Sequence, residues 1–197
     1  MDLMLRGGGK VNRTNGRIAE ESKRKICAAL LRLMSIYDYR EITVTQLSQE
    51  AELSRKTYYR LFCDKDEVLL ELFFGLYSEC AKELNARDVG QYWDLMQTYF
   101  DFWEKRRELL VILEKNGLLP RLFDYVYKEA YRNAGNIFPA VVKAGESKNN
   151  TEILPYLLSY SIGGMNGLLI KWVESGMSIP SDLLIDGVRA GINPHEQ

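Results

Sequence analysis

Residues 43–62 read TVTQLSQEAELSRKTYYRLF, and this stretch decides the fold that we expect for the chain. Thr43 and Gln46 have the spacing of a capping box, in which each side chain satisfies a backbone N–H group at the start of a helix. Ser54 is a second N-cap residue, and only three residues separate its helix from the preceding one, predicted over 44–50. Two short capped helices joined by so tight a turn are typical of a helix-turn-helix unit.

The second of these helices, predicted from Ser54 to about Leu61, carries the side chains that DNA recognition needs. Arginine can donate to guanine O6 and N7, while lysine, threonine and tyrosine can reach phosphates, and no acidic residue interrupts the set. The capped N-terminus adds a partial positive charge. The predicted DNA contacts are Thr43, Thr45, Ser54, Arg55, Lys56, Thr57, Tyr59 and Arg60. Arg60 is equally consistent with a solvated side chain, and we expect Tyr58 in the core.

Apolar residues outside this unit recur with helical periodicity. A helix over 18–37 is predicted by the stripe Ile26, Ala29, Leu30, Leu33 and Met34. Asp64, followed three residues later by Glu67, predicts a capped helix over 65–85. Further helices are expected over 89–105, 107–115, 118–144, 151–175 and 181–191. Because no segment alternates apolar and polar residues over a useful length, the predicted fold is all-α with about nine helices.

Charge is distributed unevenly along the chain. Residues 1–65 carry a net charge of +5 and residues 66–197 a net charge of −6, although the whole chain is close to neutral. Residues 1–17 are rich in glycine and basic residues, which predicts a flexible basic arm or, equally, a disordered terminus without a role. A basic N-terminal region followed by an acidic C-terminal region favours a polyanionic partner for the N-terminal region alone.

Residues 18–70 resemble the DNA-binding domain of the TetR family of transcriptional regulators. TVTQLSQEA resembles the second helix of that domain, LSRKTYYRLF its recognition helix and CDKDEVLLELF the start of its fourth helix. The resemblance covers roughly a quarter of the chain. It implies a helix-turn-helix domain over 18–64 and a helical ligand-binding and dimerisation domain over 65–197, joined by the linking helix 65–85.

This resemblance also implies a function. Family members bind palindromic double-stranded DNA as homodimers, and most are repressors that a small-molecule effector releases from the operator. Lys65 and Tyr59 are then expected to contact backbone phosphates. The segment from Tyr92 to Glu114 resembles, more distantly, a branch of the family that includes regulators of dihydroxyacetone metabolism.

Two residues depart from the family pattern. Asp38 and Glu52 stand where family members usually have glycine, so both positions are expected to have a positive φ. Aspartate tolerates that conformation fairly well, whereas glutamate costs about 1 kcal/mol there. The local turn geometry is affected rather than the fold.

The C-terminal part of the chain is rich in aromatic residues. Such a run at helical spacing is consistent with a packed core, but here the aromatic residues encircle their helix, which also suits the wall of a pocket for an apolar or ring-bearing ligand. The predicted pocket lining is Trp93, Met96, Phe100, Trp103, Tyr127 and Tyr131.

The predicted helix 151–175 contains three glycines that each cost about 1 kcal/mol of helix propensity. Close approach of a second copy of the helix would account for them, and a kinked or flexible helix is the alternative. With helix 181–191 it is expected to form a two-fold four-helix interface. The predicted interface residues are Tyr156, Tyr160, Gly163, Gly164, Gly167, Leu168 and Trp172.

Other classes of protein fit the sequence less well. His195 is the only histidine and lies near the end of the chain, and no phosphate-binding glycine loop or metal-ligand spacing is present, so we expect no enzyme activity, cofactor or metal. The three cysteines form no CxxC pair and are expected to be reduced. Without an apolar run of membrane-spanning length or a secretory signal, the expected location is the cytoplasm. The alternative function is a coactivator or interaction module that binds a protein through its helix-turn-helix.

Overall fold

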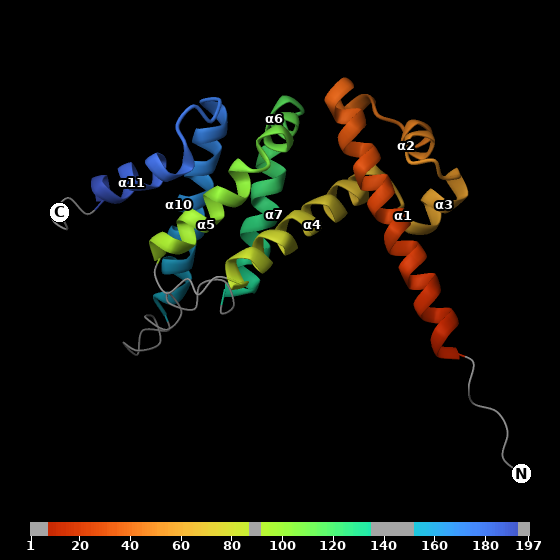
Figure 1. Cartoon of the computed structure of the whole chain (residues 1–197), viewed down its shortest axis with the longest axis horizontal. Helices are drawn as coiled ribbons and strands as arrows, with labels where there is room; N and C mark the ends of the chain where they lie inside the picture. Colours follow the sequence, from red (N-terminus) through yellow and green to blue (C-terminus); the bar gives the residue numbers. More distant parts are fainter. Residues whose placement is uncertain (1–7, 87–91, 135–151, 193–197) are drawn as a thin grey trace, which may run out of the picture. The chain divides into compact units, whose positions relative to one another are not determined.

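A computed structural model describes residues 8–86, 92–134 and 152–192 of the chain (Figure 1). Within these ranges it contains nine α-helices, one short 3₁₀ helix and no strand, which confirms the predicted all-α fold. The chain divides into two compact units, residues 1–72 and 73–197. The division falls inside one helix, α4 (Lys65–Ala86), rather than at its first residue.

The N-terminal unit consists of α1 (Gly8–Ile36), the 3₁₀ helix η1 (Tyr39–Glu41), α2 (Val44–Glu50), α3 (Arg55–Leu61) and the first turns of α4. α1 begins at Gly8 rather than at residue 18, so the expected flexible arm is helical over residues 8–17, and residues 1–7 lie outside the described ranges. Once a packed segment has nucleated a helix, each further residue adds a backbone hydrogen bond at little cost, which explains how the helix extends past its apolar stripe.

Three helix starts are capped as the sequence predicts. The Thr43 hydroxyl accepts from the Gln46 amide at 3.2 Å, and the Gln46 side chain accepts from the Thr43 amide at 2.8 Å, which completes the capping box. The Ser54 hydroxyl accepts from the Thr57 amide at 3.0 Å. Asp64 accepts from the Glu67 amide at 2.9 Å at the start of α4. These local bonds fix the bounds of α2 and α3 independently of the rest of the chain.

The two positions expected to have positive φ behave differently. Glu52, in the turn between α2 and α3, has φ of 55°, as predicted. Asp38 has φ of −63°, so that prediction was wrong. Asp38 instead caps η1, because its carboxylate accepts from the Arg40 amide at 2.8 Å, a bond that requires an extended backbone at the capping residue.

The core of the N-terminal unit is built on the apolar stripe of α1. All five residues of the predicted stripe are buried: Ile26, Ala29, Leu30, Leu33 and Met34. α1 packs on α2 and α3, whose inward residues include Leu47 and Tyr58. The short helices α2 and α3 are therefore held by burial on one side and present their other side to solvent.

The described part of the C-terminal unit contains the rest of α4 and five further helices: α5 (Tyr92–Glu104), α6 (Arg107–Lys115), α7 (Leu119–Arg132), α10 (Leu154–Glu174) and α11 (Ser181–Ile192). α10 packs on α6 and α7, and α11 packs on α5. Gly117 and Gly176, with φ of 67° and 74°, follow α6 and α10 and allow the chain to turn away. The part of the predicted helix 118–144 beyond residue 134 lies outside the described ranges.

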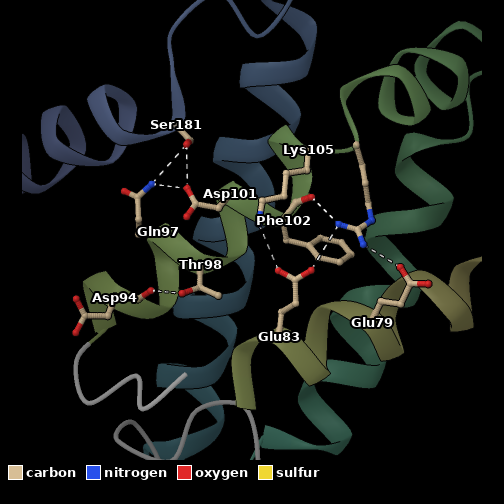
Figure 2. Close-up of polar contacts among 10 residues, drawn as sticks. Glu79, Glu83, Asp94, Gln97, Thr98, Asp101, Phe102, Lys105 and Ser181 are labelled. Carbon is tan, nitrogen blue, oxygen red and sulfur yellow. Dashed lines mark hydrogen bonds and ion pairs between the residues drawn. The ribbon is translucent and has the colours of Figure 1, made fainter. Parts of the chain in front are cut away.

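Charged residues tie α4 to the corner between α5 and α6 (Figure 2). Arg106 donates to Glu79 of α4 at 2.9 Å and lies 3.8 Å from Glu83, and its guanidinium group stacks 3.6 Å from the centre of the Phe102 ring. Lys105 approaches Glu83 at 3.9 Å. The C-terminal half of α4 is therefore held against the corner between α5 and α6 by an ion-pair network.

Candidate functional site

The outer face of α3 gathers the basic side chains of the helix-turn-helix. Arg55, Lys56 and Arg60 are exposed, and Tyr59 beside them is 52% exposed. Tyr58, one position away, is fully buried, as predicted. None of the three basic residues forms an ion pair within the described part of the chain, and Arg55 lies 5.9 Å from the centre of the Tyr59 ring. The face therefore offers hydrogen-bond donors and positive charge to an outside partner.

The predicted threonine and serine contacts are partly engaged within the unit. The Thr43 hydroxyl both accepts from Gln46 and donates to its side chain, and Ser54 and Thr57 share a hydrogen bond of 3.0 Å between their hydroxyls. Thr45 is exposed on α2. Thr43 and Ser54 thus act first as helix caps. Thr45, by contrast, lies within α2 and has no capping role.

Lys65 has a different environment from the one that the resemblance implies. Its ammonium group donates to the backbone carbonyls of Tyr39 and Arg40 at 2.8 Å each and to that of Ile42 at 3.1 Å. It also lies 4.8 Å from the centre of the Tyr39 ring. Because an ammonium group has only three donors, these carbonyls use all of them, and a phosphate contact requires one of these bonds to break. The structure makes Lys65 a clamp between the start of α4 and the segment that precedes α2.

Two hydroxyl groups inside the N-terminal unit lack partners. The side chains of Ser48 and Tyr58 are buried, and neither hydroxyl has a hydrogen bond in the structure. Burial raises the pKa of Tyr58 above its ordinary value of 10, with a smaller contribution from Asp64. These two groups weaken the core rather than recognise a ligand, because neither reaches the exposed face of α3.

The C-terminal unit contains a cavity of about 30 Å³ between four helices. α4 contributes four of the lining residues, more than any of the other three helices. The lining residues are Tyr77, Cys80, Ala81, Leu84, Tyr99, Trp103, Val126, Ala130, Ile162, Met165 and Asn166. The lining is apolar apart from a few side-chain polar atoms, and no charged side chain is among these residues.

Of the six predicted pocket residues, only Trp103 lines this cavity. Met96 and Phe100 are buried in the core, where the Phe100 ring lies 5.6 Å from that of Trp172. The Tyr127 and Tyr131 rings stack on each other at 6.3 Å, and Tyr127 shares a hydrogen bond with Ser159. Trp93 is half-buried beside the Tyr92 ring. The other five predicted residues pack in the core or lie partly exposed, and none of them reaches the cavity.

The residues that leave space open were not predicted from the sequence. Cys80, Ala81 and Ala130 are small residues at inward positions of α4 and α7, where a larger side chain would close the cavity. Tyr77, Ala81 and Leu84 lie at i, i+4 and i+7 on α4. A search for small residues within an apolar stripe, rather than for aromatic residues, is the sequence signal that could have found them.

A small group of polar atoms lies among the apolar walls. The Tyr99 hydroxyl donates to the Asn166 side-chain oxygen at 2.8 Å, and the Asn166 amide nitrogen lies 3.5 Å from the Phe123 carbonyl. Burial raises the pKa of Tyr99 well above 10, and the nearby Trp103 indole offsets part of this increase. The indole N–H itself has no acceptor in hydrogen-bonding geometry. Burial also raises the pKa of Cys80 to about 12, so the cavity is uncharged near neutral pH.

The predicted dimer residues lie on α10, and all but two of them are exposed. Tyr156 and Tyr160 are 75% and 69% exposed, and the three glycines of this helix are exposed as well. A Cβ atom added at any of the glycines meets nothing within 4 Å, so packing within the described chain does not require them. Leu168 is half-buried. Trp172 is 2% exposed and donates its indole N–H to the Ile179 carbonyl at 2.7 Å, so it belongs to the core and not to this face.

Comparisons with known proteins give no match: no family model, curated protein or solved structure is similar enough to this chain to be matched to it. None of the helices in the described ranges has both the length and the apolar character needed to span a bilayer. The same ranges contain no group of three or more histidine, cysteine and acidic residues arranged to hold a metal ion. The geometry of the two units therefore carries the functional argument.

Proposed function

We propose that this protein is a sequence-specific DNA-binding transcriptional regulator of the TetR type. The observation that supports it best is the exposed face of α3, on which Arg55, Lys56, Tyr59 and Arg60 project from a helix held by a Ser54 cap and a buried Tyr58. A short helix with donors on its free side and none of them paired internally suits the major groove of DNA. The net charge of +5 over residues 1–65 adds sequence-independent attraction to phosphate.

The regulator acts as a homodimer that binds a palindromic operator. The exposed face of α10, defined by Tyr156, Tyr160, Gly163, Gly164 and Gly167, supports a two-fold contact with a second copy. Two exposed tyrosines supply apolar area, and three glycines without a role in the chain's own packing permit close approach of another helix. Two-fold symmetry then presents two copies of α3 to two half-sites of DNA.

A small-molecule effector regulates the dimer, and its site is the cavity of the C-terminal unit. α4 contributes Tyr77, Cys80, Ala81 and Leu84 to the cavity, and the same helix begins at the Lys65 clamp. A ligand that binds one position of α4 better than another shifts the dimer between DNA-competent and incompetent states, by no more than its difference in affinity for them. Release of a repressor from its operator is the sign that the family resemblance favours.

The test is selection of operator DNA from random or genomic fragments by the full-length protein, followed by titration with single substitutions. Arg55→Ala and Lys56→Ala should each weaken operator binding by about 1–3 kcal/mol if the side chain contacts a base. The matched control is Lys115→Ala, which removes a basic side chain from the end of α6, outside the N-terminal unit, and should leave binding unchanged. Binding of the parent should weaken steeply as salt rises.

Two results contradict the proposal. Failure of the parent protein to enrich any DNA sequence would favour the alternative, a helix-turn-helix that binds a protein partner. Equal operator affinity of parent, Arg55→Ala and Lys56→Ala proteins, each verified as folded by circular dichroism, would remove α3 as the recognition helix. The sign of regulation is read separately, from transcription of a reporter placed behind the selected operator.

A further inference from the structure

The cavity of the C-terminal unit contains a hydrogen-bond donor with nothing to bind. Trp103 is completely buried, it lines the cavity, and its indole N–H has no acceptor. A buried donor without an acceptor costs about 1–3 kcal/mol, so native proteins rarely keep one without compensation. An acceptor supplied by a bound molecule removes that cost. The Tyr99 hydroxyl donates to Asn166 at 2.8 Å and could still accept through its lone pairs, but the Trp103 N–H does not meet it in hydrogen-bonding geometry.

The lining also restricts the charge of whatever binds. Within the described residues, the walls hold no arginine, lysine, aspartate or glutamate. Tyr77, Cys80 and Tyr99 all have pKa values raised by burial, so none of them ionises near neutral pH. An ion placed here loses its hydration without gaining a counter-charge, which is far more costly than burial of a neutral group.

The size of the cavity limits the group that can enter. A buried water needs about 10–15 Å³ by the same measure, so 30 Å³ accepts about two waters, and a ligand end of four non-hydrogen atoms enters only if the wall yields. Met165 lies in the wall, and its unbranched side chain can move to admit slightly more. A charged or bulky polar headgroup does not fit.

We propose that this cavity binds an uncharged molecule, or the uncharged end of one, that is apolar except for a single hydrogen-bond acceptor such as a carbonyl oxygen, and that the Trp103 indole N–H donates to that acceptor. As an effector site, the cavity depends on the proposed function. Binding itself needs no DNA, so its test succeeds or fails independently of operator binding.

The test uses three probes of four non-hydrogen atoms each: acetone, isobutene and acetate. They share a branched shape but offer, in turn, a neutral acceptor, no acceptor and a charged acceptor. Each is titrated into the full-length protein labelled at tryptophan indole nitrogens and methionine methyl groups. Trp93→Phe, Trp103→Phe and Trp172→Phe proteins assign the three indole signals, and the Met165 methyl signal reports occupancy even where the Trp103 indole is absent.

Acetone should shift the Trp103 indole and Met165 methyl signals together along a saturable curve, leaving the other two indoles unchanged. Isobutene should move the Met165 methyl with a weaker effect on the indole, and acetate should move neither. Trp103→Phe, which keeps a ring but loses the donor, should bind acetone about 3- to 10-fold more weakly and isobutene with unchanged affinity. Trp93→Phe is the matched control and should bind both as the parent does.

Three outcomes overturn the proposal. One is acetone binding that Trp103→Phe leaves unchanged, because the indole then has no part in recognition. Another is acetate binding as tightly as acetone, because the cavity then does not exclude charge. The third is the absence of any saturable shift at the Trp103 indole and the Met165 methyl, because the cavity then holds only water.

Discussion

Replacing Lys65 by methionine separates the clamp seen in the structure from the phosphate contact that the family resemblance implies. Methionine keeps most of the apolar stem of the side chain and removes the ammonium group. The three carbonyls of Tyr39, Arg40 and Ile42, now 2.8–3.1 Å from that group, then lose a charged donor. The segment before α2 should loosen, since these bonds join it to α4.

The magnitude follows from the surroundings of each bond. Hydrogen bonds to charged groups contribute about 1.5–3 kcal/mol each. The bond to Arg40 is exposed and water can replace it, whereas the bonds to Tyr39 and Ile42 are partly buried. Two bonds at the low end give about 3 kcal/mol, and the desolvation that the lysine no longer suffers offsets part of it, so Lys65→Met should lower the free energy of unfolding by about 2–3 kcal/mol.

Urea unfolding of the full chain, followed by circular dichroism, measures the change, and hydrogen exchange of a peptide over residues 37–47 locates it. Lys56→Met is the matched control, because Lys56 is exposed on α3 without an internal partner and its loss should change stability by less than about 0.5 kcal/mol. If Lys65→Met unfolds like the parent but flattens the salt dependence of DNA binding by one phosphate contact, Lys65 binds phosphate and the clamp is refuted.

Three further predictions concern the core, the cavity and α10. Tyr58→Phe should raise the free energy of unfolding by about 1 kcal/mol, because it deletes a buried hydroxyl without a partner. Tyr39→Phe should lower it by about 1 kcal/mol, because the Tyr39 hydroxyl donates to Asp66 at 2.8 Å. Urea unfolding of both variants in parallel checks the opposite signs. The pKa of Cys80 is raised from 9.0 to about 12, so the folded state keeps a proton that the unfolded chain releases. The free energy of unfolding should therefore fall between pH 9 and 12 by up to about 1.4 kcal/mol per pH unit. Cys80→Ala should make this fall shallower, and an unchanged slope contradicts the prediction. Gly164→Leu meets open space in its own chain, so sedimentation should show a folded protein shifted from dimer towards monomer, and a parent that sediments as a monomer at micromolar concentration excludes the dimer.

The helix-turn-helix could be predicted from the sequence because its determinants are local. Thr43, Gln46, Ser54 and Asp64 act on amides three residues away, so their spacing alone defines where α2, α3 and α4 begin. The apolar stripe of α1 is likewise a periodic pattern within one helix. The positive φ of Glu52, which the family resemblance implies, likewise lies in a short local turn between two helices.

Features that depend on distant parts of the chain could not be predicted in this way. The acceptors of Lys65 lie 23 to 26 residues away, and which polar group an ammonium meets depends on packing that no local pattern encodes. Trp172 shares a helix with the exposed glycines but faces the core, because its position around the α10 axis decides its burial. The cavity forms where small residues of α4 and α7 meet large ones of α5 and α10, and the space left between helices is a property of their packing, not of any one stretch of sequence.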